Sequence, residues 1–191
     1  MAASLQWLYL RLQRWANTWS NAQPPHDVKR RRGLRAFLKA KPSEQNKMPT
    51  TPNSAAPSVE EMELKDKITE LAQAAPPPRL ISLQNDFRLT TFEMNVLLLC
   101  VAVELDATVA TLCAQAQGES TRPYATFALA EQLFEDSRLD ALLPQRPLRY
   151  WGLIEIHQPG VQPLIMSALT ADETIVNYLR GGRQLDQRLA S

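Results

Sequence analysis

The chain contains 191 residues, 45% of them hydrophobic, and its formal net charge is +1. With two cysteines, no CxxC motif and two histidines far apart, the sequence offers too few ligands for a metal site. The longest apolar run, VLLLCVAV, has eight residues, whereas a bilayer span needs about twenty.

Charge and proline are unevenly distributed along the chain. Residues 1–41 hold nine Lys or Arg and one acid, whereas the remaining residues hold twelve and nineteen. Nine of the 14 prolines precede Leu80. We therefore expect a basic, proline-rich front joined to an acidic globular part. Because arginines interrupt the N-terminal apolar pattern before a secretory signal forms, we expect a cytoplasmic protein with reduced thiols.

The front of the chain begins with an amphipathic pattern. Apolar side chains recur three and four residues apart, which predicts a helix over 1–22 with one apolar stripe. The members of the stripe are Leu5, Leu8, Leu12, Trp15 and Trp19. Residues 23–58 are basic and rich in proline, and we expect them to form a disordered linker.

This linker contains a cluster of cations that is a candidate anion-binding arm. Its residues are Lys29, Arg30, Arg31, Arg32 and Arg35. Together with tryptophans of the preceding helix, residues 29–41 would contact nucleic acid or an anionic membrane surface weakly. The alternative is a solvated linker behind a helix that packs on the domain or on a neighbouring chain. We favour the alternative. A membrane contact is disfavoured because the aromatic stripe is short and the first helix carries only two positive charges.

A second amphipathic helix is predicted over 59–75, where three consecutive prolines follow. The domain proper is expected over 80–190. Thr90 and Glu93 have the spacing of a capping box, in which each residue satisfies a backbone amide of the other. The helix that they open runs to about Leu105 and is apolar on almost every side. We therefore expect it to be the central helix of the core.

Beyond this helix the pattern changes from helices to strands. Helices are predicted over 108–117, capped by Asp106, and over 126–134. Alternating apolar residues then predict a strand over 148–156, and residues 163–166 are expected to return as its hairpin partner.

The last predicted element is a helix over 171–180. Thr170 and Glu173 form a second capping-box pattern before it, and Gly181 stops it. Three helices, a two-stranded hairpin and a closing helix are the layout of a winged-helix domain. The expected fold class is therefore mainly α with a small β-hairpin, preceded by an amphipathic helix and a disordered linker.

The sequence supplies expected core residues but few candidates for chemistry. The expected core is Phe92, Leu99, Cys100, Val103, Phe127, Leu133, Trp151, Leu153 and Tyr178. Within it, Cys100 is expected to be a small buried hydrophobe, not a reactive thiol. We expect Trp151 to fill the core and Arg149 to pair with Glu104 or Asp106, the alternative being a recognition edge at the start of the hairpin. No catalytic, cofactor-binding or metal-binding residue is predicted.

Several separated segments resemble the N-terminal winged-helix domain of a group of bacterial AAA-type ATPases, some of which accompany contractile injection systems. These segments are FRLTTFEMNVLLLCVAVELD, YATFALAEQLF, ALLPQRPLRYWGLIEI, PLIMSALTADETIVNYLRG and LDQRLA. The resemblance implies a non-catalytic interaction or regulatory domain attached to an ATPase motor. In the family an ATPase module follows LDQRL, but this chain has no glycine-rich loop ending in GK[ST]. We therefore expect no ATP hydrolysis by this chain, either as part of a truncated or split ATPase or as a stand-alone protein.

Winged helices commonly bind DNA by placing the third helix in the major groove. Here residues 124–136 contain no Lys or Arg and three acids, and residues 80–191 hold eight basic and thirteen acidic residues. Because such a surface repels phosphate, we expect a protein partner or the ATPase module instead. The alternative is a DNA-binding regulator that uses the winged helix together with the basic arm.

Overall fold

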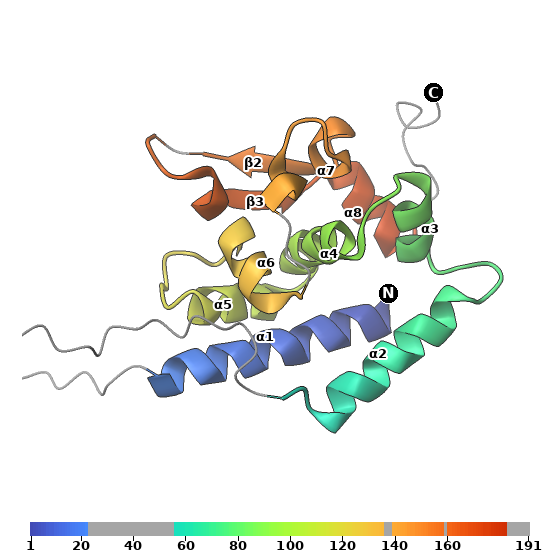
Figure 1. Ribbon diagram of the computed structural model, residues 1–191, viewed down its shortest axis with the longest axis horizontal. Helices are drawn as coiled ribbons and strands as arrows, with labels where there is room; N and C mark the ends of the chain where they lie inside the picture. The colour runs from blue at the N-terminus through green and yellow to red at the C-terminus, as the bar shows by residue number, and fades with distance from the viewer. Residues whose placement is uncertain (23–55, 136–138, 159, 183–191) are drawn as a thin grey trace, which may run out of the picture.

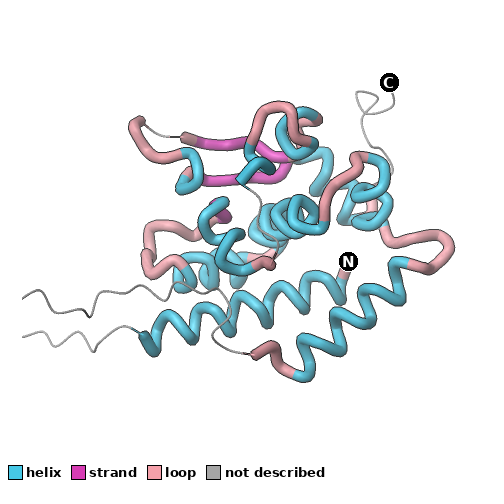
Figure 2. The backbone as a smooth tube through the Cα atoms, viewed as in Figure 1, coloured by secondary structure: helices cyan, strands magenta, loops and turns pink. Residues whose placement is uncertain are grey.

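The computed structural model describes residues 1–22, 56–135, 139–158 and 160–182. Helices dominate these residues, and a small antiparallel sheet with strand order β1-β3-β2 lies on one side (Figures 1 and 2). The expected class, mainly α with a small β element, is confirmed. The predicted anion-binding arm within 29–41 lies outside the described residues.

The first two helices lie side by side below the rest of the domain in Figure 1. Helix α1 (Ala2–Ala22) buries Leu8 and Leu12 of its predicted stripe. Helix α2 (Val59–Ala72) packs along α1. We expected the domain proper to start near Leu80, but the hydrophobic core already includes side chains of α1, because α1 packs closely on α5 and α4.

A short helix, α3 (Arg79–Asp86), leads into the central helix α4 (Thr91–Leu105). The predicted capping box is confirmed: the Thr90 hydroxyl accepts from the Glu93 backbone N–H at 3.2 Å, and the Glu93 carboxylate accepts from the Thr90 backbone N–H at 2.9 Å. Every residue from Phe92 to Ala102 is buried, because helices and the sheet cover α4 on its different sides.

The following helices carry the caps that the sequence indicates. The Asp106 carboxylate caps α5 (Ala107–Ala116) by accepting from the Thr108 backbone N–H at 2.8 Å. Strand β1 (Ala125–Thr126) leads directly into α6 (Phe127–Leu133). A single-turn 3-10 helix, η1 (Leu139–Leu142), follows.

The predicted strand over 148–156 is wrong in its first half. Residues Pro147–Tyr150 form a helical turn, α7, because proline suits the first position of a helix and its ring excludes a strand hydrogen bond. Gly152 then reverses the chain at φ +62°, a conformation that glycine adopts without strain. The strand β2 begins only at Ile154 and ends at His157 (Ile154–His157).

The rest of the hairpin also differs from the prediction. Residues Leu164–Met166, expected as the returning strand, form a 3-10 turn, η2, and the strand β3 is Ala168–Ala171. Strands β2 and β3 pair antiparallel, and β1 pairs on the other edge of β3, which makes the sheet three-stranded.

The last helix begins later than predicted, because strand β3 extends to Ala171. Because Thr170 pairs with Glu155 in the sheet, it cannot cap a helix, and Asp172 is the N-cap of α8 (Glu173–Arg180) instead. The helix ends at Gly181 in the left-handed conformation, as predicted.

Burial separates the expected core residues into two groups. The buried side chains are Phe92, Leu99, Cys100, Phe127, Leu133 and Leu153, whereas Val103 and Tyr178 are partly buried against the core. The expectation that Trp151 fills the core is wrong, since its side chain is 39% exposed. It follows the helical turn α7, so the strand alternation that would have turned it inward does not exist.

Candidate interaction sites

Helix α6 occupies the position of the third helix of a winged helix. Its inward face is apolar and buried, with Phe127 and Leu133 at its ends. The face left partly accessible carries Ala128, Glu131 and Gln132 and has no cation. Burial raises the pKa of the Glu131 carboxyl, yet it supplies no positive charge. This face offers nothing that would pair with a phosphate.

The connection between β2 and β3 forms the wing. Its described residues carry no charge from Gln158 to Met166, and Val161 is fully exposed while Ile165 is also exposed. At the wing base the His157 ring contacts the Thr170 hydroxyl at 2.8 Å. The wing therefore presents an uncharged, partly apolar tip, which suits contact with a protein better than contact with a polyanion.

A second exposed apolar surface lies at the end of α7. Tyr150 is 66% exposed and meets Trp151 edge to face, with ring centroids 4.9 Å apart. Trp151 in turn contacts the edge of Phe87 at 5.8 Å. The recognition-edge alternative for this segment therefore agrees with its exposure, and aromatic side chains of this kind are common in protein interfaces.

The expected partner of Arg149 is also wrong. Arg149 donates to the Leu142 carbonyl at 3.0 Å, and the described structure shows no ion pair between it and Glu104 or Asp106. The salt bridge of this region joins Arg146 to Glu93 at 3.1 Å. Glu93 is buried, so one carboxylate both caps α4 and fixes the start of α7.

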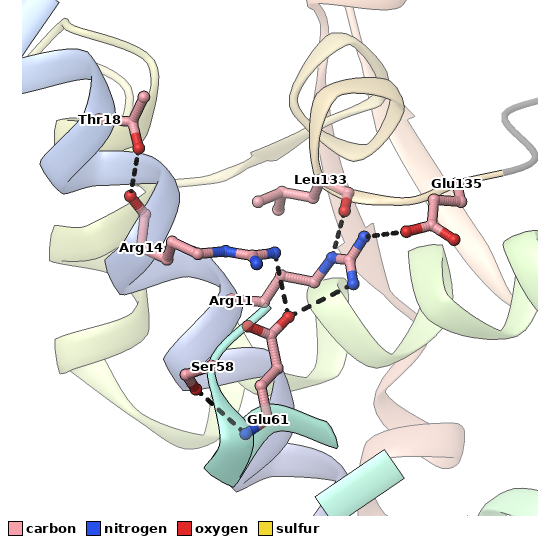
Figure 3. Close-up of polar contacts among 7 residues, drawn as sticks. All are labelled: Arg11, Arg14, Thr18, Ser58, Glu61, Leu133 and Glu135. Carbon is pink, nitrogen blue, oxygen red and sulfur yellow. Dashed lines mark hydrogen bonds and ion pairs between the residues drawn. The ribbon is translucent and has the colours of Figure 1, made fainter. Parts of the chain in front are cut away.

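A buried ionic network joins α1, α2 and the end of α6 (Figure 3). The Arg11 guanidinium lies 3.4 Å from the Glu61 carboxylate and 3.6 Å from that of Glu135, and it also donates to the Leu133 carbonyl. Arg14 pairs with the same Glu61 carboxylate at 3.1 Å. Because Glu61 is only 2% exposed, a single acid of α2 receives two cations of α1 in the protein interior.

Burial sets the electrostatics of this network. Desolvation lowers the pKa of Arg11, and the charge of Glu61 opposes that effect. Sequence reasoning missed this network because Arg11 and Arg14 lie off the apolar stripe of α1. A second stripe was nevertheless visible: Arg11, Arg14 and Thr18 are three and four residues apart, which places them on one face of the helix.

Next to the network lies a cavity of about 200 Å³ between α1, α2 and α4. Trp7, Lys65, Asn95 and Phe134 are among the residues that line it. The Trp7 ring stacks on Phe134 with centroids 6.0 Å apart, and the Arg11 guanidinium lies 5.4 Å from the Trp7 ring centre. The cavity therefore has aromatic walls and a cation at its edge.

The described residues contain no group of three His, Cys, Asp or Glu side chains arranged to hold a metal ion. Burial raises the pKa of Cys100, and it raises that of Cys113 to about 12, so both thiols stay protonated at neutral pH. In the part of the chain that is described, no helix has both the length and the apolar character of a membrane span.

The helices, the small sheet and the wing define a winged-helix domain. A family model described as "Winged helix domain, variant" matches residues 1–191, and the chain belongs to this family. No curated protein and no solved structure matches it. The match includes α1, whose side chains are part of the core, and α2, whose Leu64 and Ile68 pack against that core.

Proposed function

We propose that this chain is a non-catalytic winged-helix domain that binds a protein, and that its partner is an AAA-type ATPase motor. The observation that carries the proposal is the cation-free accessible face of α6, where a DNA-reading winged helix needs Lys or Arg. The uncharged wing lies beside α6, because the 3-10 turn η2 of the wing contacts that helix.

Support for the ATPase as partner comes from the resemblance of residues 80–190 to the N-terminal domain of these motors. The exposed apolar groups of this chain suit such a role. Val161 and Ile165 on the wing, and Tyr150 and Trp151 after α7, are large side chains left at the surface. A protein interface buries side chains of this kind at its centre, whereas a nucleic-acid interface requires cations.

Co-purification with an AAA-type ATPase module of the resembling group tests this proposal. We expect the full chain to retain the module and Val161→Glu to reduce retention at least fivefold, because a charge at the wing tip would be desolvated in the interface. Thr111→Glu, an exposed position on α5, is the matched control and should retain the module fully. Equal retention by both variants would exclude the wing, and no retention by the unchanged protein would contradict the choice of partner.

The second candidate is a DNA-binding regulator, and the observation that favours it is the charge of the front of the chain, with nine basic residues and one acid in residues 1–41. Binding of this origin would be independent of sequence and would weaken steeply with salt. Fluorescence anisotropy with random duplex DNA measures it, using the full chain and a variant in which the arm residues are replaced by Gln. These residues are Lys29, Arg30, Arg31, Arg32 and Arg35.

We expect weak binding at low salt that the Gln variant abolishes and that physiological salt removes. Glu131→Gln on α6 is the control for the winged helix itself, and it should leave the affinity unchanged. Sequence-specific binding that persists in the Gln variant would favour the DNA-binding regulator over the protein-binding domain.

A further inference from the structure

The cavity between α1, α2 and α4 contains hydrogen-bonding groups that the protein does not use. Ser4 and Asn95 line it and are only 8% and 9% exposed. Neither side chain hydrogen-bonds to another described residue. The polar atoms of both side chains nevertheless keep some accessible surface. Their remaining accessible surface therefore faces the cavity that they line. The polar atom of the cavity wall that is completely covered and unpaired is the indole N–H of Trp7. A buried donor without a partner costs free energy, so the cavity calls for an occupant that bonds to its polar groups.

The remaining walls indicate the chemistry of that occupant. Met94, Leu98, Ile68 and the aromatic pair of Trp7 and Phe134 supply apolar surface. A dry cavity of about 150 Å³ holds a benzene-sized molecule, so about 200 Å³ is enough for one ring and one small polar group.

The charges at the edge of the cavity indicate which polar group the occupant carries. Arg11 and Glu135 both line the cavity and pair with each other, whereas Lys65 makes no ion pair with any described residue. The ammonium of Lys65 only donates hydrogen bonds, and the Asn95 amide and the Ser4 hydroxyl can donate as well. The exposed Lys65 ammonium and the covered indole N–H of Trp7 can only donate, whereas Asn95 and Ser4 can donate or accept, and the charge of Lys65 is not paired within the described residues.

We propose that this cavity binds a small carboxylate with an apolar body of about one ring. The ring lies between the apolar walls, and the carboxylate accepts from Asn95 and Ser4 and faces Lys65. This site is independent of the proposed protein partner, since the wing and α7 do not contribute to it.

Benzoate is the probe, and the methyl resonances of ¹³C-labelled methionines in the full chain are the readout. We expect the Met94 methyl to shift saturably, whereas the exposed Met62 serves as the reference that does not shift. Benzamide, which has the same shape without the charge, should bind several-fold more weakly.

Two pairs of variants locate the site. Lys65→Glu should weaken benzoate binding about fivefold or more, whereas Lys67→Glu, on the same helix but outside the cavity, should not change it. Asn95→Leu should abolish binding while the protein stays folded, because it replaces an unpaired amide by an apolar group of similar size.

Three results would overturn the proposal. A Met94 methyl resonance that does not shift with up to tens of millimolar benzoate would mean that water alone fills the cavity. Equal weakening by Lys65→Glu and Lys67→Glu would reduce the effect to overall charge. Benzamide binding as tightly as benzoate would remove the carboxylate from the recognised chemistry.

Discussion

The α1–α2 junction and the wing side of the domain use the same residue types in opposite ways. At the junction Trp7 is 7% exposed and two arginines share one buried carboxylate, although both arginines lie on a helix near the chain end. On the wing side Trp151 is 39% exposed and Val161 is fully exposed, although both are large apolar side chains. Burial in this domain is thus decided by which elements pack together, and hydropathy alone misjudges both regions.

The comparison also separates stability from recognition. Side chains at the junction are covered by α1, α2 and α4, so changing them should affect folding. Those on the wing side have few neighbours to lose, so changing them should affect binding. Four predictions follow this division, and they run from the largest expected effect on stability to the smallest.

Trp7→Ala should have the largest effect. It removes a buried ring that stacks on Phe134 and leaves a cavity, for which the expected loss is about 3–5 kcal/mol of unfolding free energy. Urea unfolding followed by circular dichroism measures this loss. A loss below about 1 kcal/mol would contradict the conclusion that α1 belongs to the core.

Glu61→Ala should have the next largest effect and lower the free energy of unfolding by about 3 kcal/mol, because it leaves the Arg11 charge buried without its main partner. Glu63→Ala is the matched control on the exposed side of α2, and it should change stability by less than about 0.5 kcal/mol. If the two variants unfold alike, the network in Figure 3 does not hold α2 on α1.

Alkaline pH should destabilise the core that both regions share. The pKa of Cys113 is raised from 9.0 to about 12, so the unfolded thiol loses its proton first as the pH rises. The stability is therefore complete below pH 9 and declines above it, by at most about 1.4 kcal/mol per pH unit for each thiol.

Urea unfolding at pH 8 and pH 10 measures this decline. Cys113→Ala lowers stability at both pH values, because a buried side chain is shortened, but its loss between them should be about 1 kcal/mol smaller than that of the unchanged protein. An identical pH dependence would show that the decline arises from other groups.

Trp151→Ala should have the smallest effect, about 1 kcal/mol, because the ring contacts mainly Phe87 and Tyr150 and is already partly in water. Differential scanning calorimetry of Trp151→Ala and Trp7→Ala compares the two losses of stability directly. Equal losses for the two tryptophans would remove the distinction between the junction and the wing side.

Much of the helical framework was predictable because its signals are local. The capping box of Thr90 and Glu93, the cap at Asp106 and the stop at Gly181 depend on residues within one helical turn, and each is present. The apolar run from Val96 to Val103 likewise required a helix surrounded by protein, as α4 is.

The candidate sites were less predictable, because their members are far apart in the chain. Arg11 and Glu61 are separated by 50 residues, and Arg11 and Leu133 by 122. No periodicity within one segment pairs them. The wrong prediction that Trp151 is buried had a local cause that the sequence shows, because Pro147 favours the start of a helical turn over a strand.

The sequence by itself determined the mainly helical class, the caps at Thr90, Asp106 and Gly181, and the lack of cations on α6, because each of these features depends on residues that are close together in the chain. Only the tertiary structure decided that α1 belongs to the core and that α2 packs against it, that Glu61 binds two arginines, and that Trp7 is covered while Trp151 is partly exposed. The physical reason is that burial and ion pairing depend on which surfaces meet, and those surfaces come from segments that the chain brings together only when it folds.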